Sequence, residues 1–434
     1  MLTGVGAGLL MALLHLVQHL SYGGHGTALL PGVEAAPGWR RVLVLVLAAV
    51  VATAGLRLLG RTATGATEVT EAIWFSSGKV AFWHGIGRAV LSIVTVGMGV
   101  SLGKEGAPQL VGAAFASRAS EWADVPVWQR RLLVAAGAGA GFGAVYNVPL
   151  GGALFAVEVM LGSLALPLVL PALAMSVTAT ATAWLFLGTG PSYHVAVDRF
   201  RLSQLVFAFL MGPIIGLVGT GWTRLIGAAN RRRPKGRVRW VMPLIVFTGL
   251  GLLALRYPQL LGNGHGIVQL GISGNIGLGL LVMLFILKPL VTAACTTTGS
   301  PGGLFTPTFA VGVLLAGVAA SVWGHIWPGA VPGSYALIGG GAFLAAAMQA
   351  PLSGTVLVLE LTRHFDALMV PTLLAVVEAT VISRKLGARS IYSARARGRA
   401  LGSSPSANAA SVATIHALDE ALPPDLAQFP VRGD

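Results

Sequence analysis

The chain has 434 residues, of which 55% are hydrophobic and only 10% are charged. Soluble domains carry roughly 25% charged residues, so this composition excludes an ordinary soluble domain and indicates a protein with many membrane spans. The formal net charge of +14 lies mainly in loops and near the C-terminal end, which is typical of membrane-helix ends and not of a nucleic-acid interface. The single cysteine, Cys295, excludes an intramolecular disulfide and a cysteine metal cluster.

Long apolar runs predict the helices of the first half of the chain. Leu2–Leu20 has neither the basic start nor the small-residue cleavage site of a signal peptide, so we expect it to remain as the first span. Pro149 lacks the backbone N–H that a helix interior needs and therefore divides a later run in two. The other ranges expected before residue 190 are loops at Gly23–Gly38 and Trp122–Arg131 and helices at Arg40–Leu59, Val69–Phe75, Gly85–Val100, Gln109–Trp122, Leu132–Leu161 and Leu164–Leu187.

The second half begins after a connector, Gly190–Gln204. Short basic loops lie on the cytoplasmic side of membrane proteins, so Arg231–Arg239 predicts a cytoplasmic loop. Residues 394–434 are rich in Arg, Ser and Ala, which predicts a short polar cytoplasmic tail after a transmembrane domain of residues 1–393. The expected spans are Leu205–Ile226, Val241–Leu255, Leu278–Ala294, Leu304–Trp323, Ala336–Leu361 and Leu368–Leu386.

The stretch Ser101–Gly112 places a Lys and a Glu between two apolar runs. A charge at bilayer depth is costly, so such residues usually face a partner, a cavity or an ion path. Pro108 suits the first turn of a helix, and a helix that begins inside the membrane presents unpaired N–H groups that bind anions. The carboxylate of Glu105 would compete with such an anion, which makes Glu105 a candidate gate. The alternative is a Lys104–Glu105 pair that only extends to the membrane interface.

The two halves of the chain resemble each other. Asn147–Glu158 reads NVPLGGALFAVE and Gln349–Glu360 reads QAPLSGTVLVLE, at an offset of 202 residues. Gly303–Gly312 lies about 200 residues after the stretch around Glu105 and again places glycines ahead of a helix-starting proline. Matching broken segments in two halves of a transporter indicate a binding site where the halves meet. The repeat therefore favours an ion site, with halves of roughly residues 1–190 and 200–393.

Three motifs, at Gly103–Pro108, Gly303–Pro307 and Ser390–Ala394, resemble those of the CLC family of chloride channels and chloride/proton exchangers. Gly103–Pro108 (GKEGAP) is similar to the family's Gly-Arg/Lys-Glu-Gly-Pro motif, and Gly303–Pro307 (GLFTP) matches Gly-x-Phe-x-Pro. Ser390–Ala394 (SIYSA) matches the segment that carries the family's pore tyrosine. The resemblance implies an all-α, inverted-repeat membrane fold with broken and re-entrant helices. It also implies a homodimer in the plasma membrane with one pore per subunit, and a small anion, by default chloride, as the transported partner.

The resemblance further implies which residues form the anion site. Glu105 takes the place of the gating glutamate, and the phenol of Tyr392 is a hydrogen-bond donor to the anion. One motif departs from the family: Gly-Ser-Gly-Ile-Pro is expected where this chain has TGATE, Thr64 to Glu68, so the serine of the inner site is missing. The expected anion-binding residues are Thr64, Gly65, Ala66, Thr67, Gly103, Lys104, Gly106, Gly303, Leu304, Phe305 and Tyr392.

Proton coupling in the resembling family depends on acidic residues, and this chain lacks one of them at the expected position. Exchangers of the family usually carry two successive acids after the first Pro-Leu repeat, where this chain reads Glu158-Val159. Glu158 recurs as Glu360, and this symmetry favours a structural hydrogen-bonding role for both. We therefore expect a passive CLC-type chloride channel gated by Glu105. The alternative is a proton-coupled chloride or fluoride antiporter that uses a relocated acid, Glu68 or Glu158.

A membrane-embedded enzyme or sensor is a more remote alternative. The predicted spans contain no Asp, and the sequence has no His-Glu-x-x-His or Gly-x-Ser-x-Gly motif. We therefore expect no enzymatic activity, no metal and no cofactor. Lys288 and Glu378 each lie inside an apolar run, where a mutual salt bridge would satisfy both charges.

Overall fold

The computed structural model describes residues 1–23, 28–61, 66, 68–195, 200–274, 276–327 and 331–400. Within these ranges, seven helices are long and apolar enough to cross a membrane. A helix needs about 20 apolar residues to span the hydrocarbon core, so this is a multi-pass membrane protein. The seven are α1 (Leu2–Tyr22), α3 (Gly38–Arg61), α9 (Leu166–Leu187), α10 (Leu202–Arg231), α13 (Leu278–Thr297), α14 (Phe305–Ile326) and α17 (Phe365–Lys385).

Shorter helices fill the spaces between the long ones. Most have fewer than the about 20 residues that span a bilayer, so they begin or end within the membrane body, as the broken apolar runs predict. They are α2 (Leu29–Ala35), α4 (Val69–Phe75), α5 (Phe82–Gly97), α6 (Gly106–Trp122), α7 (Val127–Tyr146), α8 (Pro149–Leu154), the π-helix η1 (Phe155–Leu161), α11 (Val238–Leu253), the 3₁₀ turn η2 (Pro258–Leu260), α12 (His265–Ser273), α15 (Pro332–Met348), α16 (Pro351–Thr362) and α18 (Ile391–Ala400).

Most helices confirm the ranges predicted from the apolar runs. α4 begins and ends at the predicted residues, and Pro149 divides the predicted span Leu132–Leu161 into α7 and α8. Pro351 divides Ala336–Leu361 in the same way, although the sequence predicts one span there. The reason is the same in both cases, because proline cannot donate the hydrogen bond that a helix interior requires.

Two short helices lie where the sequence predicts no helix. α2 lies inside the predicted loop Gly23–Gly38, and its Pro31 occupies the first turn, where a missing N–H costs nothing. α12 has nine residues between Gly264 and Gly274, both in the left-handed conformation, and is too short to show a helical period. Glycine and proline therefore mark the ends of these helices and not an absence of structure.

Two boundaries also differ from the predicted ones. α7 begins at Val127, inside the predicted connection Trp122–Arg131, directly after Pro126. α18 continues past residue 394 to Ala400, so the segment predicted to be a polar tail begins as a helix. Residues 401–434 lie outside the described ranges.

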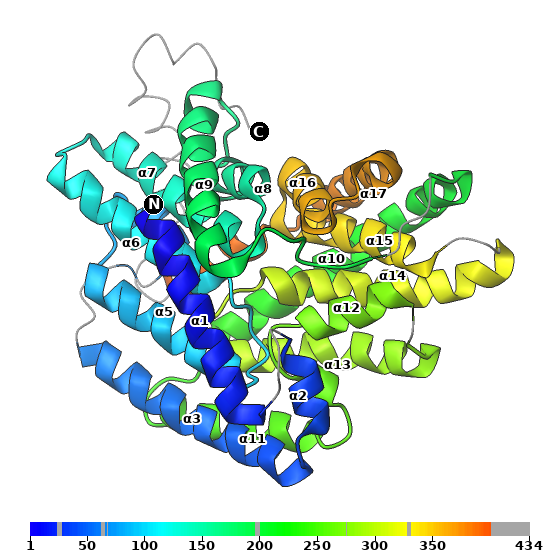
Figure 1. Ribbon diagram of the computed structural model, residues 1–434, viewed down its shortest axis with the longest axis horizontal. Helices are drawn as coiled ribbons and strands as arrows, with labels where there is room; N and C mark the ends of the chain where they lie inside the picture. The colour runs from blue at the N-terminus through cyan, green and yellow to red at the C-terminus, as the bar shows by residue number, and fades with distance from the viewer. Residues whose placement is uncertain are drawn as a thin grey trace.

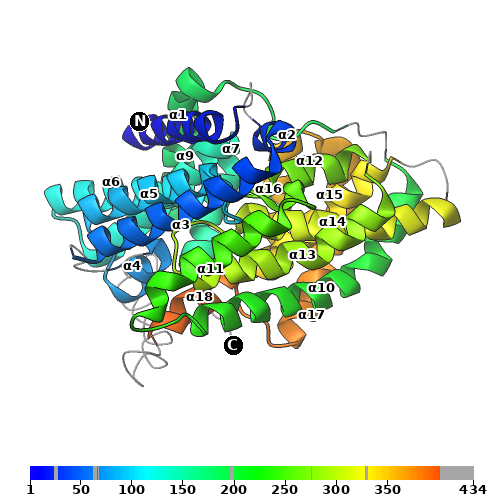
Figure 2. The ribbon, with the colours of Figure 1, turned by 90° about the horizontal axis from the view of Figure 1, so that it is seen from below.

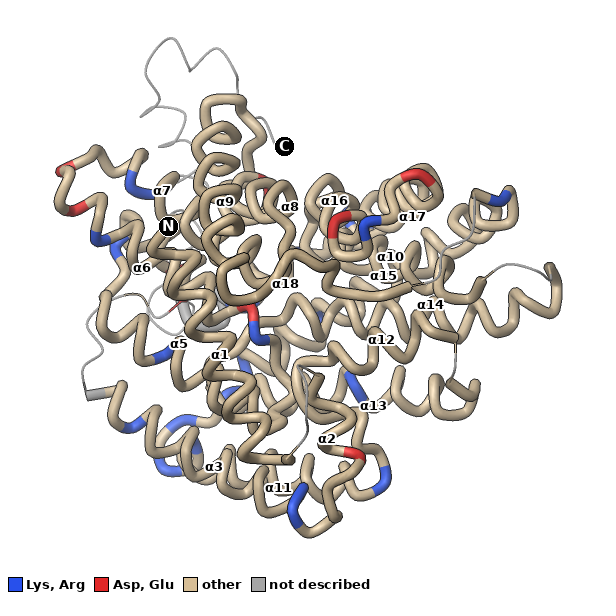
Figure 3. Tube along the Cα trace, in the orientation of Figure 1, with Lys and Arg blue, Asp and Glu red and all other residues tan. Residues whose placement is uncertain are grey.

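The helices of the two halves lie side by side in one body (Figure 1). In that view, α1, α5 and α6 of the first half occupy the left, and α12, α14 and α15 of the second half occupy the right. Seen from below, α1, α2 and α12 lie toward one face, and α10, α17 and α18 toward the opposite face (Figure 2). Charged residues lie mostly on the outer parts of the trace, with few in the interior (Figure 3). The few interior charges are therefore the first places to look for function.

Glycines hold α6 and α7 close together. A Cβ at Gly112 would lie 2.0 Å from the carbonyl oxygen of Gly137, and a Cβ at Gly137 would lie 2.4 Å from that of Gly112. Because membrane helices gain little from hydrophobic association, such close backbone contact supplies much of their packing. α6 starts directly after Glu105, so this contact helps to fix the position of that residue.

Glu158 and Glu360 each cap the start of a helix in the other half of the chain. The carboxylate of Glu158 accepts hydrogen bonds from the consecutive N–H groups of Leu352–Ser353, at 3.1 and 2.6 Å, at the start of α16. The carboxylate of Glu360 accepts hydrogen bonds from those of Leu150–Gly151, also at 3.1 and 2.6 Å, at the start of α8. These equal distances are what an inverted repeat requires, and they agree with the structural role that the sequence favours for both acids.

Candidate anion site

Two glycine-rich loops meet at the centre of the molecule, one from each half. Gly103 and Gly303 exchange two backbone hydrogen bonds of 2.7 Å, forming an isolated antiparallel bridge. α6 begins three residues after Gly103, and α14 begins two residues after Gly303, with Leu304 at its N-cap. A Cβ on either glycine would lie 2.0 Å from Oε1 of Glu105. Both positions therefore have to be glycine for the Glu105 side chain to lie between the loops.

The carboxylate of Glu105 is completely buried and lies at the N-terminus of α14. Its Oε1 accepts a hydrogen bond of 2.7 Å from the backbone N–H of Phe305, the first residue of that helix. A helix N-terminus is a natural anion site, so the carboxylate occupies the place where an anion would bind. The sequence places this competition at the helix that follows Glu105, whereas the structure shows the carboxylate on the corresponding helix of the other half.

Two hydroxyl groups complete the contacts of this carboxylate. Tyr146 Oη donates to Glu105 Oε2 at 3.1 Å, and Thr306 Oγ1 donates to the same oxygen at 3.2 Å. The two hydroxyls lie 2.5 Å apart. Sequence reasoning missed both residues, although one signal was present: Tyr146 lies just before the first Pro-Leu repeat, where the second repeat has Met348. A polar residue on one side of an otherwise apolar repeat marks a functional asymmetry.

Cavities lie on both sides of Glu105. The Lys104 cavity, of about 450 Å³, is lined by Lys104, Tyr146 and polar residues of α1 and α12. The Arg395 cavity, of about 70 Å³, is lined by Gly106, Gly303, Tyr392 and Arg395 among others. Residues 104 and 106 face different cavities, so Glu105 separates the two. Lys104 places its ammonium 5.3 Å from the centre of the Tyr146 ring, as a cation–π contact at the floor of its cavity.

Tyr392 lines the Arg395 cavity together with Gly106 and Gly303, which with Gly103 form the seam between the two loops. Its ring packs edge-on against Phe155 at 5.4 Å, and its buried hydroxyl has no hydrogen-bond partner among the described residues. Of the predicted inner segment, Thr64, Gly65 and Thr67 lie outside the described residues. Ala66 is described: it bridges to Val80 and is not among the residues that line the Arg395 cavity.

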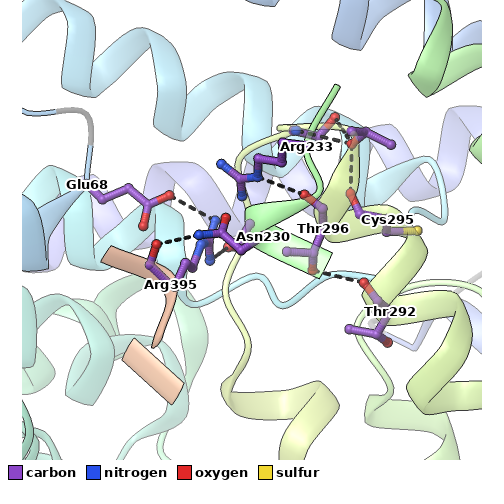
Figure 4. A network of polar contacts seen from close by, with 10 residues as sticks. Glu68, Asn230, Arg233, Thr292, Cys295, Thr296 and Arg395 are labelled. Atoms are coloured by element: carbon purple, nitrogen blue, oxygen red, sulfur yellow. Dashed lines mark hydrogen bonds and ion pairs between the residues drawn. The ribbon is translucent and has the colours of Figure 1, made fainter. Parts of the chain in front are cut away.

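Glu68, which the sequence suggests as a relocated acid, lies at the wall of the Arg395 cavity. Its Oε1 lies 3.1 Å from an Nη2 of Arg395, and the two side chains are 18% and 12% exposed. Figure 4 shows these side chains pointing toward each other beside Asn230, whose amide donates to the carbonyl oxygen of Arg395 at 2.5 Å. Sequence reasoning missed Arg395, because it falls in the stretch predicted to be a tail.

Around Glu158, the second predicted proton-path acid, no carboxylate among the described residues is available to carry a proton. Val159 is an apolar side chain with 6% exposure, on the π-helix η1. Glu158 lies beside it in sequence but directs its carboxylate to the start of α16, as described above. Glu68 is therefore the one predicted proton-path acid that lines the Arg395 cavity within the described chain.

The mutual salt bridge that the sequence allows for Lys288 and Glu378 is not formed, because the two side chains take part in separate contacts. The buried ammonium of Lys288 donates to Ser101 Oγ at 2.8 Å and to the carbonyl oxygens of Gly262 and Leu260 at 3.0 and 3.3 Å. It thereby fixes the start of the loop that carries Glu105. Glu378 lies instead against Gly212, where an added Cβ would be 2.3 Å from its Oε2.

Comparison of the sequence with known proteins identifies related transporters. Residues 43–384 match the family described as "Voltage gated chloride channel". An H(+)/Cl(-) exchange transporter ClcA from Cronobacter sakazakii is 30% identical over 376 residues, covering 81% of this chain and 79% of that protein. A putative chloride channel protein, ClcB-like, from Ralstonia nicotianae is 31% identical over 391 residues, covering 87% of this chain and 90% of that protein.

Solved structures show the same fold. A slow cyanobacterial Cl⁻/H⁺ antiporter superposes with a TM-score of 0.81 at 21% identity, covering 92% of this chain and 96% of that one. A CLC-type fluoride/proton antiporter superposes with a TM-score of 0.66 at 20% identity, covering 91% of this chain and 97% of that one. The all-α, inverted-repeat fold with broken and re-entrant helices is therefore confirmed.

Proposed function

Because the chain belongs to the voltage-gated chloride channel (CLC) family, we propose that it exchanges chloride for protons across the membrane with Glu105 as the gate. The observation that carries the proposal is the Glu105 carboxylate on the N–H of Phe305, at 2.7 Å. The relatives named as H⁺/Cl⁻ exchangers support exchange over the passive channel that the sequence alone favours.

The proposed gate works because the Glu105 carboxylate and a chloride ion both bind at the N-terminus of α14. While Glu105 is ionised, it holds the N-terminus of α14 and blocks passage between the Lys104 and Arg395 cavities. Protonation removes its charge, so a chloride ion competes successfully for the same N–H group. A proton and a chloride ion therefore bind at one place, which links their movements.

Backbone groups and hydroxyls form the proposed anion path. Lys104 attracts anions to one cavity, and the seam of Gly103, Gly106 and Gly303 leads to the hydroxyl of Tyr392 in the other. The path holds no catalytic group, and we propose a transporter without enzymatic activity. We also propose a homodimer with one such path in each subunit, as in the family.

Proton movement during chloride flux tests the proposal. Purified protein in liposomes with an outward chloride gradient is expected to take up protons against a pH gradient as chloride leaves. Glu105→Gln is expected to keep chloride flux and lose proton uptake, because glutamine cannot carry the proton. Glu121→Gln, at an exposed site paired with Arg118, is the matched control and is expected to behave as wild type. Chloride flux without proton uptake in the wild type would contradict exchange.

A passive channel is the second candidate function, and Val159 favours it. Valine has no titratable group, and Glu158 is held by two N–H groups at the start of α16. Exchange then requires Glu68 as the inner acid. Glu68→Gln in the same liposomes separates the candidates: proton uptake that disappears supports exchange through Glu68, and a wild type without uptake supports the channel. Fluoride in place of chloride tests the fluoride form of the exchanger.

A further inference from the structure

A basic cavity outside the proposed ion path lies near the C-terminal end of α3. This Arg239 cavity, of about 420 Å³, is also lined by α5 and by the segment that joins α10 and α11. Among the described residues that line it, four are basic and one is acidic: His84, Arg88, Arg233, Arg239 and Glu71. Three guanidinium groups against one carboxylate leave an excess of positive charge, which attracts an anionic ligand.

Contacts with the protein hold two of these guanidinium groups in place. Arg233 lies between α10 and α11, and its Nε donates to the carbonyl oxygen of Thr296 at 3.1 Å (Figure 4). The guanidinium carbon of Arg239 lies 3.9 Å from the centre of the Trp240 ring, and that of Arg57 lies 5.0 Å from the same centre. A guanidinium held in this way loses little freedom when it binds a ligand, and its planar set of donors matches the oxygens of a phosphate group.

The cavity lies at the edge of an exposed apolar surface. α3 and α11 pack against each other (Figure 2), and the cavity is lined by Leu56 and Leu59 near the end of α3 and by Trp240 near the start of α11. Exposed apolar side chains follow one face of each helix at helical spacing. They are Leu43, Leu47, Val50 and Leu58 on α3, and Val238, Val241, Ile245 and Leu252 on α11. Tryptophan and arginine beside such a surface are typical of the level of the lipid headgroups.

The volume of the cavity favours a ligand larger than a halide ion. A water molecule occupies about 30 Å³ in the liquid, so one small ion would leave most of the about 420 Å³ unfilled. Pockets of about 300–1,000 Å³ hold ligands with many non-hydrogen atoms. A phosphate group with a short polar substituent, such as the glycerol of a phospholipid headgroup, fits both the volume and the charge.

The predicted orientation places this cavity at the cytoplasmic leaflet. The basic residues between α10 and α11 predict that this end of the molecule is cytoplasmic. The cytoplasmic leaflet carries anionic lipids, and basic pockets between transmembrane helices on this side bind lipid headgroups.

We propose that the Arg239 cavity binds the headgroup phosphate of an anionic phospholipid, with Arg233 and Arg239 as charged ligands and the acyl chains along the apolar faces of α3 and α11. The site goes beyond ion transport and does not rest on chloride/proton exchange. Arg88 lines both this cavity and the Arg395 cavity, so the bound phosphate lies next to the ion path.

Native mass spectrometry of the full-length protein in detergent, with equal amounts of phosphatidylglycerol and phosphatidylcholine, tests the site. The wild type is expected to retain phosphatidylglycerol at least about tenfold more than phosphatidylcholine, because only the former carries a net negative charge. The double variant Arg233→Met, Arg239→Met is expected to lose this preference, and Arg233→Lys, Arg239→Lys to keep part of it. The matched control, Lys385→Met, Arg389→Met, removes two exposed charges elsewhere on the same predicted face and is expected to keep the wild-type preference.

Glycerol phosphate, which has the same headgroup phosphate without acyl chains, separates a lipid from a soluble ligand. In calorimetry on delipidated protein, it is expected to bind at least about 100-fold more weakly than short-chain phosphatidylglycerol, because it buries no apolar chain. Equally tight binding of glycerol phosphate would overturn the lipid as the ligand. An unchanged lipid preference in the Arg233→Met, Arg239→Met variant would overturn the site. Equal retention of the two lipids by the wild type, with less chloride flux in that variant, would make the cavity an entrance for chloride instead.

Discussion

Glu105 is a fully buried carboxylate whose side chain accepts three hydrogen bonds. Its two oxygens receive one backbone N–H and two hydroxyl groups, all within 3.2 Å. A carboxylate with these donors is well satisfied while ionised, and it holds a position that an anion also favours. Under the proposed function, the Glu105 carboxylate and a chloride ion therefore compete for one set of donors.

Removing the charge of Glu105 should remove the pH dependence of anion flux. Glu105→Gln keeps the shape of the side chain but cannot ionise, so the competitor is absent at every pH. We expect its chloride flux to vary by less than about twofold between pH about 4.5 and about 7.5, whereas wild-type flux increases as the pH falls. Flux into liposomes at a series of pH values is the measurement. A mutant with the wild-type pH profile would show that the gate lies elsewhere.

Tyr146 should hold the gate closed. Tyr146→Phe removes one hydroxyl from Glu105 Oε2, and a hydrogen bond to a charged group contributes about 1.5–3 kcal/mol. The anion then displaces the carboxylate more easily, so we expect chloride flux at neutral pH to rise about tenfold. Tyr257→Phe, where the ring contacts Arg256, serves as the control. A fall in flux would instead indicate that the hydroxyl binds the anion more tightly than it binds the carboxylate.

The sequence predicts several residues at the centre of the candidate site but not all of the side chains that contact them. Glu105, Gly303 and Tyr392 are predictable because each lies in a local motif whose spacing has a physical meaning. Tyr146 and Arg395 act through contacts 41 and 327 residues away along the chain, with Glu105 and Glu68. The asymmetry of the repeat at Tyr146 and Met348 is the one sequence signal for Tyr146, and no local pattern marks Arg395. Their roles depend on how α7 and α18 pack, which a single sequence does not reveal.

At the scale of elements, helix ends are the important features. α6 and α14 begin at the seam, and α8 and α16 begin at residues capped by a glutamate of the other half. Apolar runs predict the long helices well, because length and hydropathy are properties of a local segment. They predict poorly where one run contains two helices, as at Pro351, or where a helix is short and flanked by glycine, as α12 is.

The two capping glutamates should contribute equally to stability. Glu158→Gln and Glu360→Gln each replace a carboxylate that accepts two backbone N–H groups, so each should destabilise the fold by about 1–3 kcal/mol. Thermal unfolding in detergent should show similar decreases in Tm, with Glu121→Gln unchanged, and chloride flux should persist. Loss of proton uptake in Glu158→Gln at unchanged Tm would assign Glu158 to a proton path instead.

At the scale of the whole molecule, the cavities define two faces. The Lys104 cavity opens among α1 and α12, and the Arg239 cavity, lined by Arg88, Arg233 and Arg239 among others, lies beside the basic residues that join α10 and α11. Those basic residues predict that the second face is cytoplasmic. Glu105 and the seam lie between the Lys104 and Arg395 cavities, so the proposed ion path crosses the molecule at this point.

Labelling from each side of the membrane tests this orientation. Single cysteines at Gly236 and Arg389, in a Cys295→Ser background, should react with a membrane-impermeant reagent from the cytoplasmic side only. A cysteine at His194, which lines the Lys104 cavity, should react from the opposite side only. The native Cys295 is fully buried, and its replacement by the similarly sized serine removes the one native thiol as a background site for the reagent. Reaction of Gly236→Cys and His194→Cys from one side would contradict the two-faced arrangement.

The capping of each half by a glutamate of the other half has a consequence for biosynthesis. The N–H of Gly151 has no carboxylate to donate to until Glu360, 209 residues later, has been made. At about 5–20 residues per second, the ribosome needs roughly 10–40 s to add that length of chain. For that interval, the newly inserted first half holds a helix start without its partner, so its final packing has to wait for the second half. Two separately translated halves, cut between α9 and α10, would therefore have to be made in the same membrane at the same time to yield a working pore.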